Sequence, residues 1–187
     1  MLTEQKLKDK RYRKTEEAIV GAFFLAQDNL NPKKIIKIAN ISRATLYRHH
    51  KSVYNVATDY KEYITKKYAS IINKSINRGA TLRQIFQRTL VFIIANRKII
   101  AFIQKFGDQS VIESMLYTLE PRVIDSHKVD PGEMCDIYVK ETSAIIESWF
   151  AQGAHPTQFT AVISKLTYLT DTAKSHLGKI CSVHVLQ

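Results

Sequence analysis

The 187-residue sequence predicts an all-α fold, and three observations support that prediction. Apolar residues recur at spacings of three and four along most of the chain, whereas the alternating pattern of a strand is nearly absent. Pro, Gly and capping residues stand where these periodic segments begin and end. Apolar residues make up 45% of the chain, which is enough for a packed core. The pattern divides into an N-terminal domain of three helices, residues 1–55, and a larger helical domain, residues 56–187.

The first helix is predicted from about Thr15 to Asp28. Asn31 is then a good N-cap residue, and Pro32 fits the first helical position because its missing N–H would have no partner there. The second helix runs from Pro32 to Ala39. The residues of these two helices that we expect to face the core are Ala18, Ile19, Ala22, Phe23, Leu25, Ala26, Ile35, Ile36 and Ala39.

A tight turn and a third helix follow. Asn40 tolerates the left-handed conformation that such a turn usually needs. Ser42 is a favourable N-cap for a helix that extends to about Lys51. Leu46 and His50 are four residues apart, so we expect both to face the first two helices while the other side chains project outward. Two short helices joined by a tight turn and packed on a longer helix form a helix-turn-helix.

The larger domain is predicted to contain further helices. Gly79 suits the position just past a helix C-terminus, Gly107 is a second stop, and Pro121 ends another helix. The segment Arg122–Gly132 is either a loop or a short helix. The helices expected in this part of the chain are Val53–Ile76, Thr81–Ala95, Lys98–Phe106, Gln109–Leu119, Glu133–Gln152 and Pro156–Thr170.

Positive charge is concentrated in the first part of the chain. Residues 1–80 hold 17 Lys and Arg against 7 Asp and Glu, a formal charge of +10, whereas residues 81–187 hold 11 against 10. Such an asymmetry is typical of a protein that binds a polyanion. Nucleic acid is favoured over an anionic membrane, because no N-terminal segment pairs a basic face with a broad apolar one.

Other features indicate a cytoplasmic protein without a membrane partner. The charged start of the chain lacks the apolar core of a signal peptide, and the densest apolar patch, Leu90–Ala95, is too short to span a bilayer. Cys135 and Cys181 fit neither a disulfide framework nor a metal-ligand spacing, which predicts reduced thiols. We expect no cofactor and no metal. The sequence shows no glycine-rich phosphate loop and no cluster of catalytic side chains, so we do not expect an enzyme.

The segment Ile35–Ser52, IIKIANISRATLYRHHKS, resembles the DNA-binding domain of TetR-family transcriptional regulators. Ala39-Asn40-Ile41-Ser42 matches the Ala-Gly-Val-Ser-like turn of that family. Thr45-Leu46-Tyr47-Arg48-His49 matches the Thr-Leu/Phe-Tyr-x-His run that follows the turn. The resemblance covers about the first third of the chain; the rest agrees only in length and helical layout. It implies a homodimeric regulator, most often a repressor, that binds a palindromic operator in double-stranded DNA.

Three positions depart from the family pattern. Ala44 stands where many members have Gly, and His50 stands where an aromatic residue packs inward. Val53 stands where a Lys usually contacts phosphate, a contact that the neighbouring Lys51 is placed to replace. None of these changes removes the motif.

The resemblance and the helical spacing together indicate which residues contact DNA. Arg43 begins the third helix, where a guanidinium can donate two hydrogen bonds to guanine O6 and N7. Ala44 would contact a thymine methyl, Tyr47 a base edge or a phosphate, and Arg48 a base or the backbone. The residues expected at phosphates are Lys33, Lys34, Thr45, His49 and Lys51, and Ser42 belongs to the same interface. The alternative, that Arg43 and Arg48 are ordinary solvated charges, is disfavoured by the motif around them.

Two features leave alternatives open. The basic segment Lys8–Lys14 either enters a minor groove or lies along phosphates, or it is a solvated tail. His50 is a candidate pH switch because desolvation lowers the pKa of an imidazole; the plainer interpretation is a core histidine with a satisfied ring nitrogen. We do not expect His49 and His50 to bind a metal together, because neighbouring side chains on a helix point about 100° apart.

The last two predicted helices are candidates for a dimer interface. Ile145 and Trp149 are four residues apart, as are Ile146 and Phe150, so apolar side chains cover more than one side of the helix. One side would face the domain core and the other a partner subunit; an internal helical hairpin is the alternative. The residues expected at the interface are Ile145, Ile146, Trp149, Phe150, Phe159, Val162, Ile163, Leu166 and Leu169.

The resemblance also implies a cavity for an effector, either a small molecule or a protein, of unknown identity. Candidate lining residues are Phe86, Phe92, Phe102, Phe106, Met115, Tyr117 and Trp149, although such residues are more often plain core. The main alternative function is a non-specific DNA-organising protein that uses the same basic domain.

Overall fold

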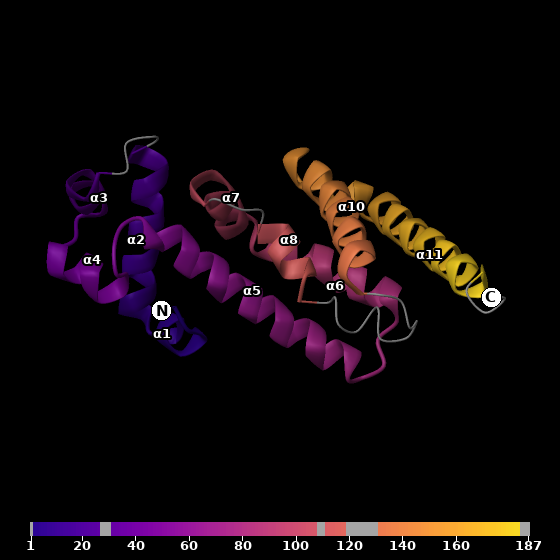
Figure 1. The fold of residues 1–187 in the computed structure, drawn as a ribbon. Coiled ribbons are helices and arrows are strands. Elements are labelled where there is room, and N and C mark those ends of the chain that lie inside the picture. Colours follow the sequence, from indigo (N-terminus) through magenta and orange to yellow (C-terminus); the bar gives the residue numbers. More distant parts are fainter. Residues whose placement is uncertain (1, 27–30, 108–110, 119–130, 184–187) are drawn as a thin grey trace. The chain divides into compact units, whose positions relative to one another are not determined.

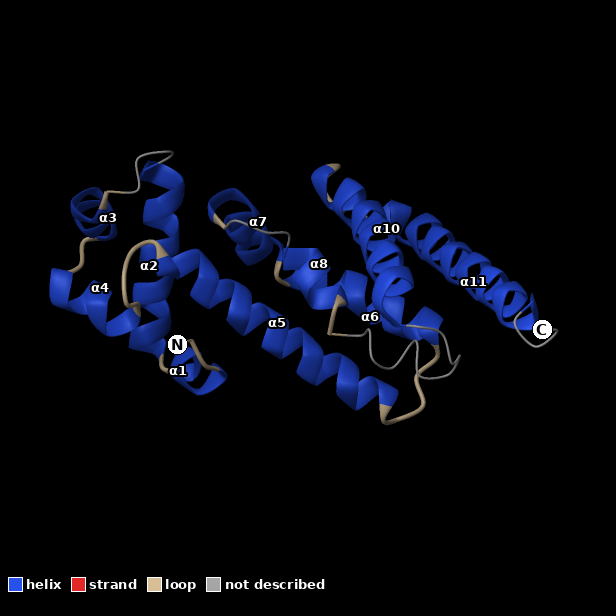
Figure 2. Ribbon diagram, in the orientation of Figure 1, coloured by secondary structure: helices blue, strands red, loops and turns tan. Residues whose placement is uncertain are grey.

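The computed structural model describes residues 2–26, 31–107, 111–118 and 131–183 (Figure 1), without the side chains of residues 131–137 and 173–183. Within those ranges the chain is helical and contains no strand, which confirms the all-α class (Figure 2). The helices are α1 Glu4–Lys8, α2 Lys10–Ala26, α3 Pro32–Ala39, α4 Arg43–His49, α5 Asn55–Ile76, α6 Leu82–Ala95, α7 Arg97–Phe106, α8 Val111–Leu116, α10 Pro131–Ala151 and α11 Phe159–Val183, with a 3-10 turn, η1 Pro156–Gln158, before α11.

The chain forms two compact units, which are described separately here. Unit 1 comprises residues 1–66 and 97–109, and unit 2 comprises residues 67–96 and 110–187. The expected N-terminal domain, residues 1–55, lies within unit 1. This unit also contains the first part of α5, up to Lys66, and the whole of α7.

Helix α2 begins earlier than the predicted Thr15, at Lys10. Asp9 explains the difference, because its Oδ1 accepts the backbone N–H of Arg11 at 2.8 Å and of Tyr12 at 3.1 Å. A carboxylate in this position satisfies N–H groups that have no partner within the helix. The same two hydrogen bonds lower the pKa of the Asp9 carboxyl. The basic segment that includes α2's first turns is therefore helical rather than a structureless tail.

The buried face of α2 agrees with most of the predicted stripe. Its predicted members that are buried are Ile19, Ala22, Phe23 and Ala26. The prediction for Leu25 is wrong: its side chain is 71% exposed, because it lies roughly 100° around the helix from the centre of that stripe. Ala18 is half-buried. The predicted end at Asp28 lies outside the described residues.

Helix α3 has the predicted bounds, Pro32–Ala39, and buries Ile35 and Ala39, while Ile36 is half-buried. Helix α4 ends at His49, two residues before the predicted end at Lys51. Its end follows from the next residue, His50, whose backbone is extended, with φ −135° and ψ 147°.

Aromatic side chains from α2, α5 and α7 form the core of unit 1. The ring of Phe23 lies edge-on to the rings of Phe102 and Phe106, with centroids 5.2 Å and 5.4 Å apart. Tyr60 meets Phe102 in the same way at 5.7 Å. Edge-to-face contacts of this kind add to the free energy gained by burial. Phe102 and Phe106, which the sequence offered as effector contacts, therefore pack within unit 1.

Unit 2 starts with the end of α5 and a turn that the sequence predicts correctly. Gly79 has a φ of +75°, a left-handed conformation that a residue with a side chain rarely adopts. Thr81 then begins α6 with a capping box: its hydroxyl accepts the N–H of Gln84, and the Gln84 side chain accepts the N–H of Thr81. On this helix the hydroxyl of Thr89 lies 2.9 Å from that of Tyr68.

Helices α8, α10 and α11 complete unit 2, and α11 packs against both α10 and α6. The prediction that the last helix ends near Thr170 is wrong, because α11 continues to Val183. The sequence after Thr170 contains no proline that would stop it. Most of the segment 122–132, for which a loop or a short helix was expected, lies outside the described residues; its end, from Pro131, belongs to α10.

Among the described helices, none combines the length and the apolar character that crossing a bilayer requires.

Candidate nucleic-acid interface

The turn between α3 and α4 is formed by the residues that the sequence singled out. Asn40 adopts the left-handed conformation, with φ 51° and ψ 49°, and its N–H bonds back to α3. The Ser42 hydroxyl accepts the backbone N–H of Thr45 at 3.0 Å, which starts α4. Asn31 caps α3 in the same manner, through its side-chain oxygen and the N–H of Lys33 at 2.9 Å. All three predicted capping and turn roles are confirmed.

Helix α4 presents one exposed face and one buried face. Arg43, Ala44, Tyr47 and Arg48 are exposed, whereas Leu46 is completely buried. The exposed face thus carries two guanidinium groups, a phenol and a methyl group on less than two helical turns. Side chains of these types are able to hydrogen-bond base edges and phosphates and to contact a thymine methyl.

The exposed polar side chains of α4 are held by contacts with one another. The Arg43 guanidinium lies over the Tyr47 ring, 5.5 Å from its centroid, which is a cation–π contact. The Arg48 Nη2 donates to the Thr45 hydroxyl at 3.2 Å, and that hydroxyl lies 2.8 Å from the Ser42 hydroxyl. These contacts restrict the side-chain rotamers, so less conformational entropy is lost when a ligand orders the same groups.

The lysines expected at phosphates are exposed, but one has a partner. Lys33 and Lys51 are exposed at the start of α3 and just after α4. The Lys34 Nζ donates to the carbonyl of Ala26, the last residue of α2, at 3.1 Å. A cation at this position interacts favourably with the negative end of the helix dipole. Lys34 is therefore engaged within unit 1, whereas Lys33 and Lys51 face solvent.

The expectation that His49 projects outward is wrong. His49 is only 6% exposed, and its Nδ1 lies 2.6 Å from the Oε1 of Glu16. The ring of Tyr12 stacks on it, with centroids 4.0 Å apart and an interplanar angle of 16°. The sequence could not show this, because the partner carboxylate comes from α2, 33 residues earlier. His49 is accordingly removed from the candidate DNA contacts.

His50 is buried as predicted, but both of its ring nitrogens face carboxylates. Its Nε2 lies 3.1 Å from Glu16 Oε2, and its Nδ1 lies 2.7 Å from Asp59 Oδ2. The Tyr60 hydroxyl also donates to Glu16 Oε2, at 2.9 Å. Glu16 is 1% exposed, and its carboxylate is hydrogen-bonded to side chains from the end of α4 and from α5. We call Glu16, His49, His50, Asp59 and Tyr60 the buried polar cluster.

The two neighbouring histidines reach the same carboxylate although a helix would point them apart. This is possible because only His49 is helical, while His50 has an extended backbone. The prediction based on a 100° separation therefore does not apply to this pair. In the part of the chain that the structure describes, no group of three or more His, Cys, Asp or Glu side chains is arranged to hold a metal ion.

The pKa directions follow from these contacts. Burial alone would raise the pKa of Glu16, but the hydrogen bond and charge of His50, with hydrogen bonds from His49 and Tyr60, lower it below its usual value. Burial alone would lower the pKa of His50, but its hydrogen bonds to Glu16 and Asp59 and their negative charges raise it. The expected lowering of the His50 pKa is therefore corrected in sign.

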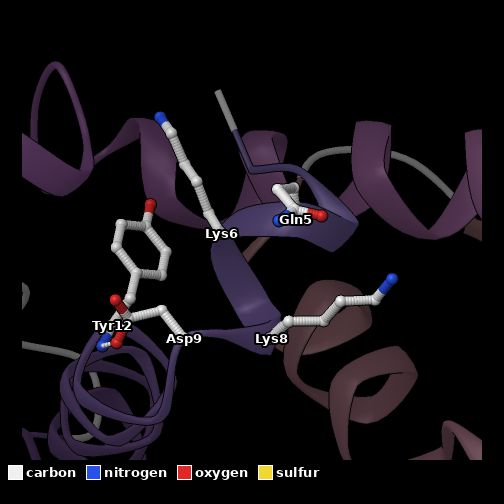
Figure 3. A pocket seen from close by; sticks show the side chains of 5 residues that line it. All are labelled: Gln5, Lys6, Lys8, Asp9 and Tyr12. Atoms are coloured by element: carbon white, nitrogen blue, oxygen red, sulfur yellow. Dashed lines mark hydrogen bonds between the residues drawn. The ribbon is translucent and has the colours of Figure 1, made fainter.

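Basic side chains also surround the corner where α1 meets α2. Five residues line an open hollow at this corner, and Figure 3 shows their side chains: Gln5, Lys6, Lys8, Asp9 and Tyr12. The Lys6 Nζ lies 5.8 Å from the centroid of the Tyr12 ring. Because Tyr12 stacks on His49, the first turn of α2 lies beside the C-terminal end of α4. The exposed basic residues next to Tyr12 in sequence are Lys10, Arg11, Arg13 and Lys14.

Tyr54 is a candidate contact that sequence reasoning missed. It lies just before α5 and is 69% exposed, while Val53 and Val56 beside it are buried. The signal was present in the sequence, since Val53, Val56, Ala57 and Tyr60 form a helical apolar stripe from which Tyr54 is excluded. An exposed tyrosine close to Lys51 offers a hydroxyl to a phosphate.

The residues predicted for a dimer interface separate into two groups. Ile146, Trp149, Val162, Ile163 and Leu166 are buried by their own chain, so they belong to the core of unit 2 and the prediction for them is corrected. The remaining four, which are half-buried in the single chain, are Ile145, Phe150, Phe159 and Leu169. The sequence pattern could not separate the groups, because an apolar stripe packs equally well on its own chain or on a partner.

Comparison of the chain with models of protein families, with curated protein sequences and with solved structures finds no match.

Proposed function

We propose that this protein is a sequence-specific DNA-binding transcriptional regulator of the TetR kind, in which α3, the turn at Asn40 and α4 form a helix-turn-helix. Helix α4 would enter the major groove as the recognition helix. The observation that supports this most directly is the division of α4 into an exposed face, with Arg43, Ala44, Tyr47 and Arg48, and a buried face fastened to unit 1.

The charge distribution supports the same proposal. Affinity would come mainly from lysine and arginine contacts to phosphates, with release of the counterions that DNA holds. Lys33, Lys51 and the exposed basic residues at the start of α2 are the candidates, and Tyr54 adds a hydroxyl. Sequence preference would come from Arg43, Ala44 and Tyr47, with Arg48 on a base or on the backbone.

Dimerisation on a two-fold symmetric operator is part of the proposal, because a single helix-turn-helix contacts few base pairs. Four apolar residues are half-buried in the single chain, Ile145 and Phe150 on α10 and Phe159 and Leu169 on α11. Tyr168 on α11 is 74% exposed. An exposed aromatic residue beside half-buried apolar ones is typical of a surface that a partner subunit covers. Repression, and a response to a bound effector, enter the proposal through the family resemblance alone.

The first test is selection from a pool of random DNA duplexes in the presence of excess competitor DNA, followed by sequencing of the retained molecules. A two-fold symmetric motif is the expected result. Retention of duplexes without any shared motif would contradict the proposal and favour a non-specific DNA-organising protein, whereas failure to retain DNA at all would contradict both.

The second test compares two arginine variants on the selected site. Arg43→Ala should weaken binding by about 1–3 kcal/mol and relax the choice at one base pair of each half-site. Arg83→Ala removes another exposed guanidinium, from the first turn of α6 in unit 2, so it should leave affinity nearly unchanged. An unchanged base preference in Arg43→Ala would remove Arg43 from the residues that read the sequence.

A further inference from the structure

The buried polar cluster holds the C-terminal end of α4 to two other helices. Glu16 comes from α2, His49 and His50 from the end of α4, and Asp59 and Tyr60 from α5. Glu16 on α2 is hydrogen-bonded to His49, His50 and Tyr60. His50, just after α4, is also hydrogen-bonded to Asp59 on α5. The position of α4 on unit 1 therefore depends on polar contacts as well as on the burial of Leu46.

The number of donors around Glu16 indicates that this carboxyl is ionised. Its Oε1 faces the Nδ1 of His49, and its Oε2 faces both the Nε2 of His50 and the hydroxyl of Tyr60. An ionised carboxylate has acceptor sites for all three donors, whereas a protonated one must use an oxygen as a donor itself. The lowered pKa of Glu16 agrees with this assignment.

The two neighbours of His50 then determine the state of its ring. Neutral imidazole has one N–H, so it can donate to either Glu16 or Asp59, and the other nitrogen would turn its lone pair toward a carboxylate oxygen. Imidazolium has two N–H groups and donates to both. Since both distances, 2.7 Å and 3.1 Å, are those of hydrogen bonds, the geometry fits the charged ring.

We propose that His50 is a positioning residue that carries a proton at neutral pH. Its charged ring holds the C-terminal end of the recognition helix against α2 and α5 through hydrogen bonds to both helices. This attachment is lost as the solution becomes alkaline. The link to DNA binding rests on the proposed function. The attachment itself does not.

The groups that face the ring account for the direction of the pH effect. Glu16 from α2 and Asp59 from α5 are the negative groups beside His50. Tyr60 also lies beside its ring, and the preceding residue His49 carries Tyr12 stacked on it. The pKa of His50 is raised from an ordinary value of 6.5, so its contribution is complete below pH 6.5 and is lost as the pH rises through the raised pKa. The Glu16 contribution is lost at the other end, as the pH falls from 4.5 through its lowered pKa.

The direct test is an NMR titration of the histidine rings in the full-length protein, with the His50 signal assigned from its loss in His50→Gln. The ring of His50 should remain charged above pH 6.5, the ordinary value from which its pKa is raised. Titration of His50 at or below pH 6.5 would overturn the proposal. Ring signals correlated with the assigned backbone of the unmodified chain give the same assignment if His50→Gln does not fold.

The second measurement tests whether the charge positions α4. Amide hydrogen exchange should show protection factors of α4 that fall as the pH rises above 6.5, while those of α10 in unit 2 stay constant. His50→Gln should show weaker but pH-independent protection of α4, and His155→Gln should behave like the unmodified chain. Protection of α4 that is independent of pH in the unmodified chain would overturn the positioning role.

The third measurement adds DNA. Affinity for the selected duplex should fall with rising pH, by up to tenfold per pH unit once His50 begins to lose its proton, because one proton is linked to the competent state. His50→Gln should lose this slope, and His155→Gln should keep it. Equal slopes in all three proteins would overturn the link between His50 and DNA binding. A chain that binds no DNA at any pH would contradict the proposed function, while the ring titration and the α4 protection would still decide the inference.

Discussion

The two units bury polar side chains in different ways. In unit 1 the buried polar cluster joins two carboxylates, two imidazoles and a phenol, so it contains ionisable groups of both signs. In the described part of unit 2, two contacts between buried or half-buried side chains join neutral hydroxyls, Tyr68 with Thr89 at 2.9 Å and Tyr138 with Thr170 at 2.8 Å. A buried charge is strongly destabilising once its partner is lost, whereas a neutral hydroxyl is much less so. Unit 1 should therefore be the more sensitive to pH and to the loss of a single polar group.

The largest effect is expected for Glu16→Ala. It leaves the charge of His50 with Asp59 alone, and it removes the acceptor of His49 and Tyr60. The cost should be about 3–5 kcal/mol in the free energy of unfolding, measured by urea denaturation near pH 6. It should be smaller at alkaline pH, where His50 is neutral.

Glu17→Ala provides the matched control, because Glu17 is the next residue but is exposed and forms only a surface pair with Arg13 at 3.7 Å. Its effect should stay within about 0.5 kcal/mol. Similar costs for the two variants would show that the charged cluster does not distinguish unit 1.

Leu166→Ala should give the next largest effect, about 3 kcal/mol, because it deletes a completely buried side chain from α11 in unit 2. No charged group is involved, so the cost should be the same at pH 6 and pH 8.5. Tyr168→Ala on the exposed face of the same helix should change the free energy of unfolding of the single chain by less than about 0.5 kcal/mol. A pH-dependent cost for Leu166→Ala would break the contrast between the units.

Tyr68→Phe should have the smallest of the three effects, about 1 kcal/mol, because it removes one buried neutral hydrogen bond. Thr89 keeps a partner after the change, since its hydroxyl also donates to the Ile85 carbonyl at 2.9 Å. Thermal unfolding at several pH values measures the effect. A cost close to that of Glu16→Ala would mean that neutral and charged buried groups are equally important in this protein.

Much of the fold was predictable because its signals are local. The caps at Asn31, Ser42 and Thr81, the turn at Asn40 and the stop at Gly79 act through backbone groups within a few residues, so the residue type alone determines them. The bounds of α3 and the start of α4 were correct for that reason. The exposed positions of α4 followed from helical periodicity once its first residue was known.

Other features required the tertiary structure, because they depend on residues far apart in the sequence. Glu16 lies 33 and 34 residues from the two histidines that it contacts, and nothing in the local pattern distinguishes it from the exposed Glu17. The same holds for α11, whose apolar stripe showed that it is buried but not whether its own chain or a partner covers it. Sequence alone thus determined the all-α class, the local caps and turns, and the basic character of the first part of the chain, since these depend on short-range chemistry. Packing between distant helices decided that His49 faces inward and that both ring nitrogens of His50 face carboxylates, because buried side chains take their partners from whichever helix lies against them.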